Sequence, residues 1–288
     1  MKEGSREISK ELLKEVVQGS LDFHIHVAPD VEKKRIGDAY DLTLQAKESG
    51  MRGIVIKSHD YPTAPLAHLI NRVIGGIEVV GGIALNTGVG GLNPDAVEVS
   101  AKLGAKVVWM PTNSSRAARR RKGLEQGIFI LGEKGNVLPE VKEILSLVKQ
   151  FDLVLCTGHL SKEEIFPLQD EALKMGIARF VLTHPLKGGG GPIDLKAQKE
   201  IAEKGAVVEH CFLATLSLSG RLDPSEIVEA IRLVGAERCL LSTDFGQLYN
   251  PPPSEGMRMM IATMLECGLS EKELALLVKE NPCRLLNL

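Results

Sequence analysis

Short apolar runs alternate with amphipathic segments along most of this chain. Eight runs are long enough to form one strand each, and they cover residues 21–27, 52–59, 78–85, 105–111, 152–159, 179–185, 205–212 and 238–246. Intervening segments such as 38–50 and 195–205 show the spacing of amphipathic helices. Near-continuous apolar strands alternating with helices predict a parallel sheet that is covered on its faces. Eight such units predict an α/β fold closed as a (β/α)8 TIM barrel, with a doubly wound open sheet as the alternative.

Glycines support the predicted ends of the helices. Several helical segments reach a glycine two or three residues before the next strand, namely Gly50, Gly104, Gly176 and Gly205. Glycine adopts the left-handed conformation that commonly ends a helix, so these positions predict C-terminal caps.

Three segments depart from the strand–helix alternation. Residues 1–20 form a charged, amphipathic lead-in that predicts an N-terminal helix. Residues 112–138 are too long for a simple connection, and 127–138 resemble a β-hairpin turning at residues 134–136, which we interpret as a lid over the barrel mouth. Four consecutive glycines at 188–191 permit either motion or a close approach of the backbone to a ligand.

Length, composition and net charge indicate the domain organisation and the class of partner. With 288 residues, 44% of them hydrophobic, it is expected to form a single domain over 1–288. The 35 basic and 37 acidic residues leave a net charge of −2, which favours a small-molecule substrate over nucleic acid or an anionic membrane. The N-terminus lacks a secretory signal and no long apolar run follows, so we expect a cytoplasmic protein. Homo-oligomerisation stays open.

Residues able to bind a metal gather at the ends of the predicted strands. They are His24, His26, Lys57, His59, His159, His184, Glu209, His210 and Asp244. The C-terminal ends of barrel strands converge on one mouth, where active sites are built. Of the seven histidines, only His68 lies outside this pattern, in a predicted helix. We therefore predict a shared metal site at the barrel mouth.

The order of these residues resembles the amidohydrolase superfamily of metal-dependent hydrolases. The likeness rests on a His-x-His after the first strand, histidines at the fifth and sixth strands and an aspartate at the eighth, and it covers Leu21 to Gly246. The final residues, ENPCRLLNL, are similar to an Asn-Pro helix that often closes such chains. The resemblance implies metal ligands at His24, His26 and His159. It also implies that His184 is a second-metal ligand or a catalytic residue that orients water, and that Asp244 is both ligand and general base.

One position departs from the family's pattern. Members with two metals often place a carboxylated lysine or a glutamate at the end of strand four, where this chain reads VVWMPT. One arrangement is a single metal held by His24, His26, His159 and Asp244, with His184 hydrogen-bonded to the metal-bound water. In another, Lys57 is carboxylated and supplies the bridge from strand two, with His59 as a further ligand. An ion pair of Lys57 with Glu209 or with a substrate carboxylate is the third.

Substrate contacts are harder to place. Glu209 and His210 are adjacent, so strand alternation lets only one point inward, and we choose Glu209. We assign Glu209 and Lys187 to substrate binding, with a plain salt bridge as the alternative for Glu209 and a structural role for His210. The basic run from Arg116 to Lys122 is interpreted as a solvated face or subunit contact rather than a grip on an acidic substrate.

The predicted chemistry is activation of water by a divalent cation. Imidazole and carboxylate ligands suit Zn²⁺ best, although Mn²⁺, Fe²⁺ and Ni²⁺ also fit. Such a cation lowers the pKa of bound water from about 15.7 to about 7, and Asp244 would carry its proton to the departing nitrogen. We expect a hydrolase of a C–N bond in an amide, lactam or amidine. The alternatives are a decarboxylase or other lyase on the same barrel, and a noncatalytic metal- or ligand-binding barrel.

Overall fold

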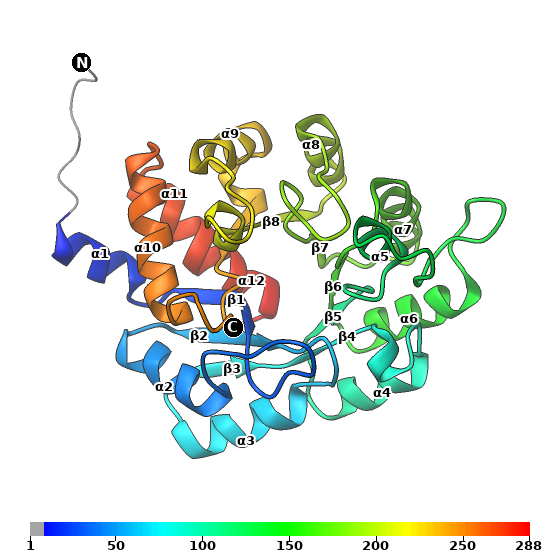
Figure 1. Ribbon diagram of the computed structural model, residues 1–288, viewed down its shortest axis with the longest axis horizontal. Helices are drawn as coiled ribbons and strands as arrows, with labels where there is room; N and C mark the ends of the chain where they lie inside the picture. Colours follow the sequence, from blue (N-terminus) through cyan, green and yellow to red (C-terminus); the bar gives the residue numbers. More distant parts are fainter. Residues whose placement is uncertain (1–8) are drawn as a thin grey trace.

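The computed structural model describes residues 9–288, in which parallel strands are ringed by helices (Figure 1). The strands are β1 (Leu21–His26), β2 (Gly53–Lys57), β3 (Glu78–Val80), β4 (Gly82–Ala84), β5 (Val107–Trp109), β6 (Val154–Cys156), β7 (Phe180–Leu182), β8 (Val207–Cys211) and β9 (Cys239–Ser242). They pair in parallel in the orders β1-β2-β3 and β4-β5-β6-β7-β8-β9. All eight apolar runs identified in the sequence therefore contribute to the sheet.

The first and last strands meet and close the ring. The backbone N–H of Asp244 donates to the carbonyl of His24 at 2.8 Å, and the N–H of His26 donates to the carbonyl of Phe245 at 2.7 Å. This junction confirms the predicted barrel and excludes the open sheet.

The third predicted strand is divided at Gly81. It forms β3 and β4, which pair with β2 and β5 respectively. A Cβ at Gly81 would lie 2.6 Å from the backbone N and Cα of Ala64, at the start of α3 (Ala64–Ile74). The start of α3 therefore packs against the break between β3 and β4, and only glycine leaves room for that contact.

Strand β1 contains a bulge that changes which residues face the barrel interior. Its register against β2 advances from Asp22–Ile54 to Ile25–Ile56, so β1 holds one extra residue. Phe23 consequently packs in the inner core, although simple alternation placed it on the face opposite His24. His24 and His26 both face the cavity at the end of the barrel.

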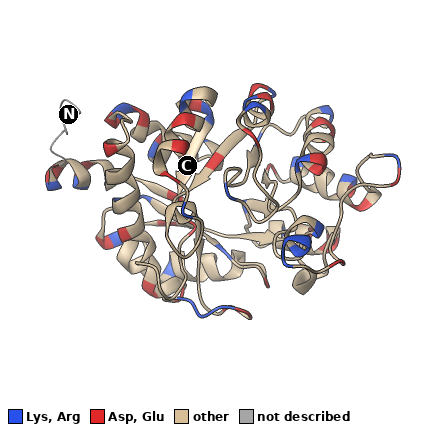
Figure 2. Ribbon diagram, turned by 45° about the horizontal axis from the view of Figure 1, so that its top comes forward, with Lys and Arg blue, Asp and Glu red and all other residues tan. Residues whose placement is uncertain are grey.

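Helices cover the outside of the barrel. They are α1 (Lys10–Val17), α2 (Ala39–Glu48), α3, α4 (Pro94–Lys102), α5 (Arg116–Arg121), α6 (Pro139–Gln150), α7 (Lys162–Lys174), α8 (Leu195–Glu203), α9 (Pro224–Val234), α10 (Pro253–Glu266), α11 (Glu271–Ala275) and α12 (Asn281–Leu286). All four glycines predicted as caps have positive φ. Figure 2 shows both signs of charge interleaved over the outer helices.

The C-terminal helix closes one end of the barrel. Leu285 and Leu286 of α12 join the small inner core formed by β-strand residues such as Phe23 and Trp109. The outward-facing strand residues belong instead to the larger core that packs against the surrounding helices. Because α12 fills the end where the strands begin, the only polar mouth of the described barrel is at the other end.

The predicted insertion and lead-in are present where the structure describes them. Residues 112–138 contain α5 and a turn in which Leu131 and Val137 form an antiparallel bridge. Helix α1 lies in the predicted lead-in, and residues 1–8 of that prediction lie outside the described residues. Within 9–288, no helix has the length and apolar character needed to cross a bilayer.

Candidate functional site

A cavity of about 180 Å³ opens at the C-terminal ends of the strands. It is lined by most of the predicted site residues, namely His24, His26, Lys57, His59, His159, His184, Lys187 and Asp244. The barrel therefore brings together side chains that are up to 220 residues apart in the chain, as parallel strand ends in a barrel must.

Three potential ligand atoms converge at the junction of β1 and β9. Oδ1 of Asp244 lies 3.1 Å from Nε2 of His26 and 3.4 Å from Nε2 of His24. Asp244 has a φ of +57°, a left-handed conformation that aspartate tolerates better than most residues. This backbone turn directs its carboxylate towards the two imidazoles.

A buried carboxylate that sequence reasoning passed over fixes this junction. Asp22 accepts hydrogen bonds from the backbone N–H of Thr243 at 3.0 Å and of His24 at 3.2 Å, and from the Thr243 hydroxyl. Burial raises the pKa of Asp22 to about 7, although these hydrogen bonds oppose the shift. Asp22 therefore connects the backbone of β1 at His24 with the backbone after β9 at Thr243, the residue before Asp244. The only sequence signal was an acidic residue inside an apolar strand.

Glu209 faces the barrel interior but lies behind His24. Its Oε1 is 3.2 Å from Nδ1 of His24, its side chain is fully buried, and it does not line the cavity. Burial raises the pKa of Glu209 to about 7. We predicted a contact with substrate, whereas this geometry makes Glu209 the partner that orients His24. Its neighbour His210 points away, beside Leu222 and Ile227.

Cys211 is a second neighbour of His24 that the sequence did not single out. Its Sγ lies 3.9 Å from Nδ1 of His24, and burial raises the pKa of the thiol well above its usual value. Within residues 9–288, three potential ligands lie within 4.8 Å of one another in two groups: His24, His26 and Asp244, and His24, Glu209 and Cys211. The first group offers two imidazole nitrogens and one carboxylate oxygen, which are common ligands of Zn²⁺.

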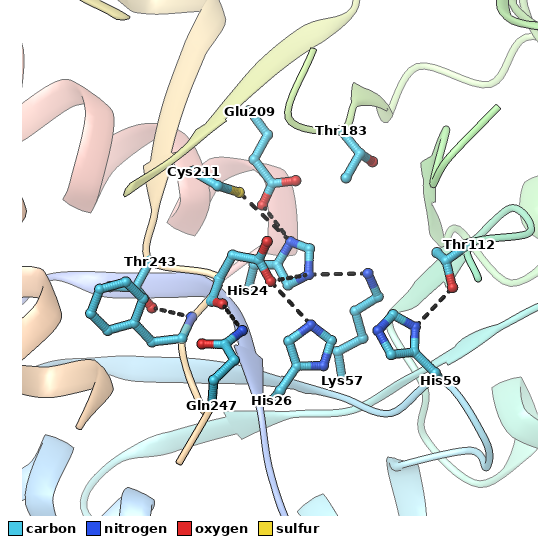
Figure 3. A network of polar contacts seen from close by, with 12 residues as sticks. His24, His26, Lys57, His59, Thr112, Thr183, Glu209, Cys211, Thr243 and Gln247 are labelled. Carbon is cyan, nitrogen blue, oxygen red and sulfur yellow. Dashed lines mark hydrogen bonds and ion pairs between the residues drawn. The ribbon is translucent and has the colours of Figure 1, made fainter. Parts of the chain in front are cut away.

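Lys57 lies against the same imidazole. Its Nζ is 3.0 Å from Nε2 of His24 (Figure 3). The same atom is 5.1 Å from the ring centroid of Trp109. Trp109 thus occupies the end of the fourth predicted strand, where the usual bridging ligand is missing. No ion pair joins Lys57 to Glu209 within 4.0 Å, which excludes that predicted pair from this structure. Burial lowers the pKa of Lys57, although Asp244 opposes the shift.

The other histidines continue around the mouth. Ring centroids are 4.7 Å apart for His26 and His59, 6.3 Å for His59 and His159, and 5.1 Å for His159 and His184. Nδ1 of His59 is hydrogen-bonded to the Thr112 hydroxyl at 2.8 Å. Nδ1 of His159 and of His184 are buried without a hydrogen-bond partner. His159 and His184 therefore line the same cavity, but neither belongs to the group formed by His24, His26 and Asp244.

Burial keeps these imidazoles in the form that binds metals. It lowers the pKa of His24 to about 3 and that of His184 to about 4, with nearby positive charge adding to the shift for His24. It also lowers the pKa of His26, His59 and His159 well below the usual value. Neutral imidazole is the ligand form, so the donor set fits a divalent cation at neutral pH.

The glycine run covers two of these histidines. A Cβ added at Gly189 would lie 2.3 Å from Nδ1 of His159, and one at Gly188 would lie 2.7 Å from Nδ1 of His184. The sequence left open whether the glycines serve motion or a close approach to a ligand, and the close approach found here is to two histidine rings of the chain itself. The backbone here packs directly onto the imidazole rings.

The basic run and the predicted lid lie elsewhere. None of residues 116–122 lines the cavity, and the Arg116 guanidinium instead stacks 3.1 Å from the centroid of Phe129. Helix α5 is drawn almost wholly blue in Figure 2. From the segment 112–138, only Asn113 lines the cavity, so the hairpin is not part of the pocket wall.

Comparison with known proteins identifies the family of the chain. Residues 19–209 match the model of DUF6282, described as a family of unknown function. The chain belongs to this family. No curated protein matches it.

Solved structures with the same fold as this DUF6282 chain include proteins named as an amidohydrolase, a probable dipeptidase and a decarboxylase. An amidohydrolase from Pseudomonas aeruginosa is 15% identical, with a TM-score of 0.67 over 96% of this chain and 97% of that one. The probable dipeptidase PvdM from the same organism is 11% identical, with a TM-score of 0.69 over 97% and 98%. A 2,6-dihydroxybenzoate decarboxylase from Rhizobium is 12% identical, with a TM-score of 0.55 over 94% and 99%. At these identities the likeness establishes that the DUF6282 chain has the amidohydrolase-type barrel.

Proposed function

We propose that this protein is a metal-dependent hydrolase that uses water to cleave a C–N bond in a small amide, lactam or amidine. One observation carries the proposal: His24, His26 and Asp244 converge within hydrogen-bonding distance at the mouth of an amidohydrolase-type barrel. His159 and His184 line the same cavity. Zn²⁺ suits this donor set best, and Mn²⁺, Fe²⁺ and Ni²⁺ also fit it.

A bound divalent cation would polarise the scissile bond and make water a stronger acid near neutral pH. The residues of the chain would do the rest. The carboxylate of Asp244 would accept a proton from the attacking water and donate it to the departing nitrogen as the C–N bond breaks. Glu209 would accept a hydrogen bond from Nδ1 of His24, which leaves the lone pair of the ring on Nε2, the atom that faces Asp244 and Lys57. His184 would orient the water or the substrate carbonyl.

The chemical state of the Lys57 side chain, amine or carbamate, distinguishes the two metal arrangements. An ammonium 3.0 Å from His24 would repel a cation, so binding requires a neutral or modified Lys57. With a neutral amine, the single-metal arrangement with His24, His26, His159 and Asp244 follows. With a carbamate formed from carbon dioxide, Lys57 would supply a bridging carboxylate and His59 a further ligand. Carbon-13 NMR after equilibration with labelled bicarbonate distinguishes the two arrangements, because only the carbamate gives a new carbonyl signal that Lys57→Met abolishes.

A decarboxylase is the second candidate. Positively charged side chains on the cavity wall fit a carboxylated substrate, which such an enzyme requires. The barrel of the Rhizobium decarboxylase also has the same fold. Hydrolysis adds an oxygen atom from solvent to the product and decarboxylation does not, so turnover in ¹⁸O-labelled water separates them. A noncatalytic binding barrel would show neither reaction.

Metal analysis tests the common basis of these proposals. Protein stripped with a chelator, resupplied with Zn²⁺ or Mn²⁺ and desalted should retain one or two ions per chain. His24→Ala and the milder His26→Gln should each lower that content, whereas His68→Ala, on the exposed face of α3, should not. Retention close to zero in the wild-type protein, with a normal circular dichroism spectrum, would refute the metal site.

A further inference from the structure

The cavity wall carries more positive charge than the proposed chemistry needs. Lys33 and Arg35 reach it from the loop after β1, and Lys187 reaches it from the loop after β7. Asp244 is the only acidic residue among the cavity-lining side chains, all of which lie within residues 9–288. A neutral substrate would gain little from three cationic groups around the reacting carboxylate.

The loop that carries Lys33 and Arg35 is held in place by one carboxylate. Oδ1 of Asp30 accepts hydrogen bonds from the backbone N–H groups of Glu32 at 3.0 Å and Lys33 at 2.7 Å. Its Oδ2 accepts from Nε of Arg35 at 2.9 Å and also from Nη2. This leaves Nη1 of Arg35 available, on a side chain that is only 1% exposed.

The same loop is joined to the loop that carries Asp244. Arg35 forms an antiparallel bridge with Gln247, and the N–H of Ile36 donates to the carbonyl of Gly246 at 2.9 Å. The positions of Lys33 and Arg35 are therefore fixed relative to Asp244. Such a preorganised arrangement lowers the entropic cost of binding a ligand.

The three cationic groups differ in how far their charge is compensated. Arg35 pairs with Asp30, so its charge is largely balanced while its direction is fixed. Lys33 and Lys187 are exposed, and neither forms an ion pair within 4.0 Å in the described chain. These two uncompensated ammonium groups approach the cavity from two different loops. They create a positive field at the entrance, which concentrates anions there.

We propose that the substrate carries an anionic group, a carboxylate or a phosphate, which Lys33, Arg35 and Lys187 bind while its reacting bond lies at Asp244. The reacting end of this inference rests on the proposed function, whereas the anion subsite stands on the cavity wall alone. A cavity of about 180 Å³ admits only a small molecule of this class. Arg35 contributes a directed N–H donor, and the lysines contribute charge.

Calorimetric titration of the metal-loaded protein at low ionic strength tests the subsite. The probes are glutarate, its neutral diamide glutaramide, and inorganic phosphate. Either anion should bind at least tenfold more tightly than glutaramide, and the tighter anion assigns the group as carboxylate or phosphate. Lys33→Gln and Lys187→Gln should each weaken binding of that anion about three- to tenfold, as expected for the loss of one hydrogen bond at a solvent-exposed position. Lys122→Gln, an exposed position outside the cavity, should leave binding unchanged.

Several results would overturn the proposal. They are no detectable binding of either anion, equal affinity for glutarate and glutaramide, or anion binding that both lysine substitutions leave intact. The last would mean coordination to the metal alone. Repeating the titration on chelator-treated protein separates the two proposals. If the chain holds no metal but the subsite exists, the lysine-dependent preference for anions should persist. If the subsite does not exist, metal content should be normal and that preference should be absent.

Discussion

Replacing Gly189 by alanine should displace an imidazole at the site. The added Cβ would lie 2.3 Å from Nδ1 of His159 and 2.7 Å from two of its ring carbons. Ordinary van der Waals contact begins at 3.4 Å, so the ring or the loop must move by about 1 Å. Gly189 does not have a positive φ, so its backbone conformation suits alanine. The steric clash between the new Cβ and His159 is therefore the only effect expected of the substitution.

Two magnitudes follow from that displacement. Overpacking of this kind typically costs about 1–3 kcal/mol of folding stability, and the partly exposed glycine loop places the cost near the lower end. If His159 binds the metal, a ring displaced by this amount should reduce metal affinity roughly 10- to 100-fold, as loss of ligand support does.

Competition with a chromophoric chelator measures the affinity, and urea unfolding of the metal-free protein measures the stability. Gly132→Ala is the matched control, because it also lacks a positive φ and its nearest neighbours would be 3.8 Å from the new Cβ. His159→Ala sets the full effect of losing the ring. If Gly189→Ala matches wild type in both measurements while His159→Ala does not, the close-packing argument for the glycine run fails. If His159→Ala also binds metal normally, His159 is not a ligand.

Three further substitutions or deletions test other parts of the site. Asp244→Asn should fold normally and lose about two to four orders of magnitude in turnover, with His68→Asn unaffected; near-normal turnover in metal-replete protein would remove Asp244 as the base. Burial lowers the pKa of His210 from 6.5 to about 4, so the unfolded chain binds this proton more tightly and stability should fall as pH drops through that window, by up to roughly 3 kcal/mol. Urea titrations at pH 7 and 4.5 should show that His210→Gln loses less stability than wild type, whereas His68→Gln loses the same amount. Deleting residues 132–136 should lower turnover more than the melting temperature if the hairpin is a lid, and the opposite result would make it structural.

Local patterns predicted the barrel well because its strands are apolar, are separated by helices and end in polar residues. The break at Gly81 was not visible, because it depends on the start of α3 pressing against the strand. The bulge in β1 was also hidden, since the letters of residues 21–26 alternate without interruption. In both cases a tertiary contact or a pairing register determined the local geometry.

The sequence predicted which residues gather at the site but not how their side chains are arranged. Strand ends converge in any barrel, so His24, His26 and Asp244 could be grouped before their geometry was known. The approach of Lys57 to His24 and the position of Glu209 behind that ring depend on side-chain packing. Lys33 and Arg35 lie in a loop whose path depends on Asp30 and on the bridge to Gln247, and no local pattern marks them.

The meeting of β1 with β9 has a consequence for how the protein matures. The hydrogen bonds between Asp22 and Thr243 span 221 residues, and the three potential metal ligands His24, His26 and Asp244 lie on either side of the same junction. A growing chain therefore carries two of its histidines from the outset but has no complete site until its last strand arrives. A cation that binds only the complete site would stabilise the closed barrel by mass action, relative to every partly folded state. Metal uptake would then report that the whole barrel has folded.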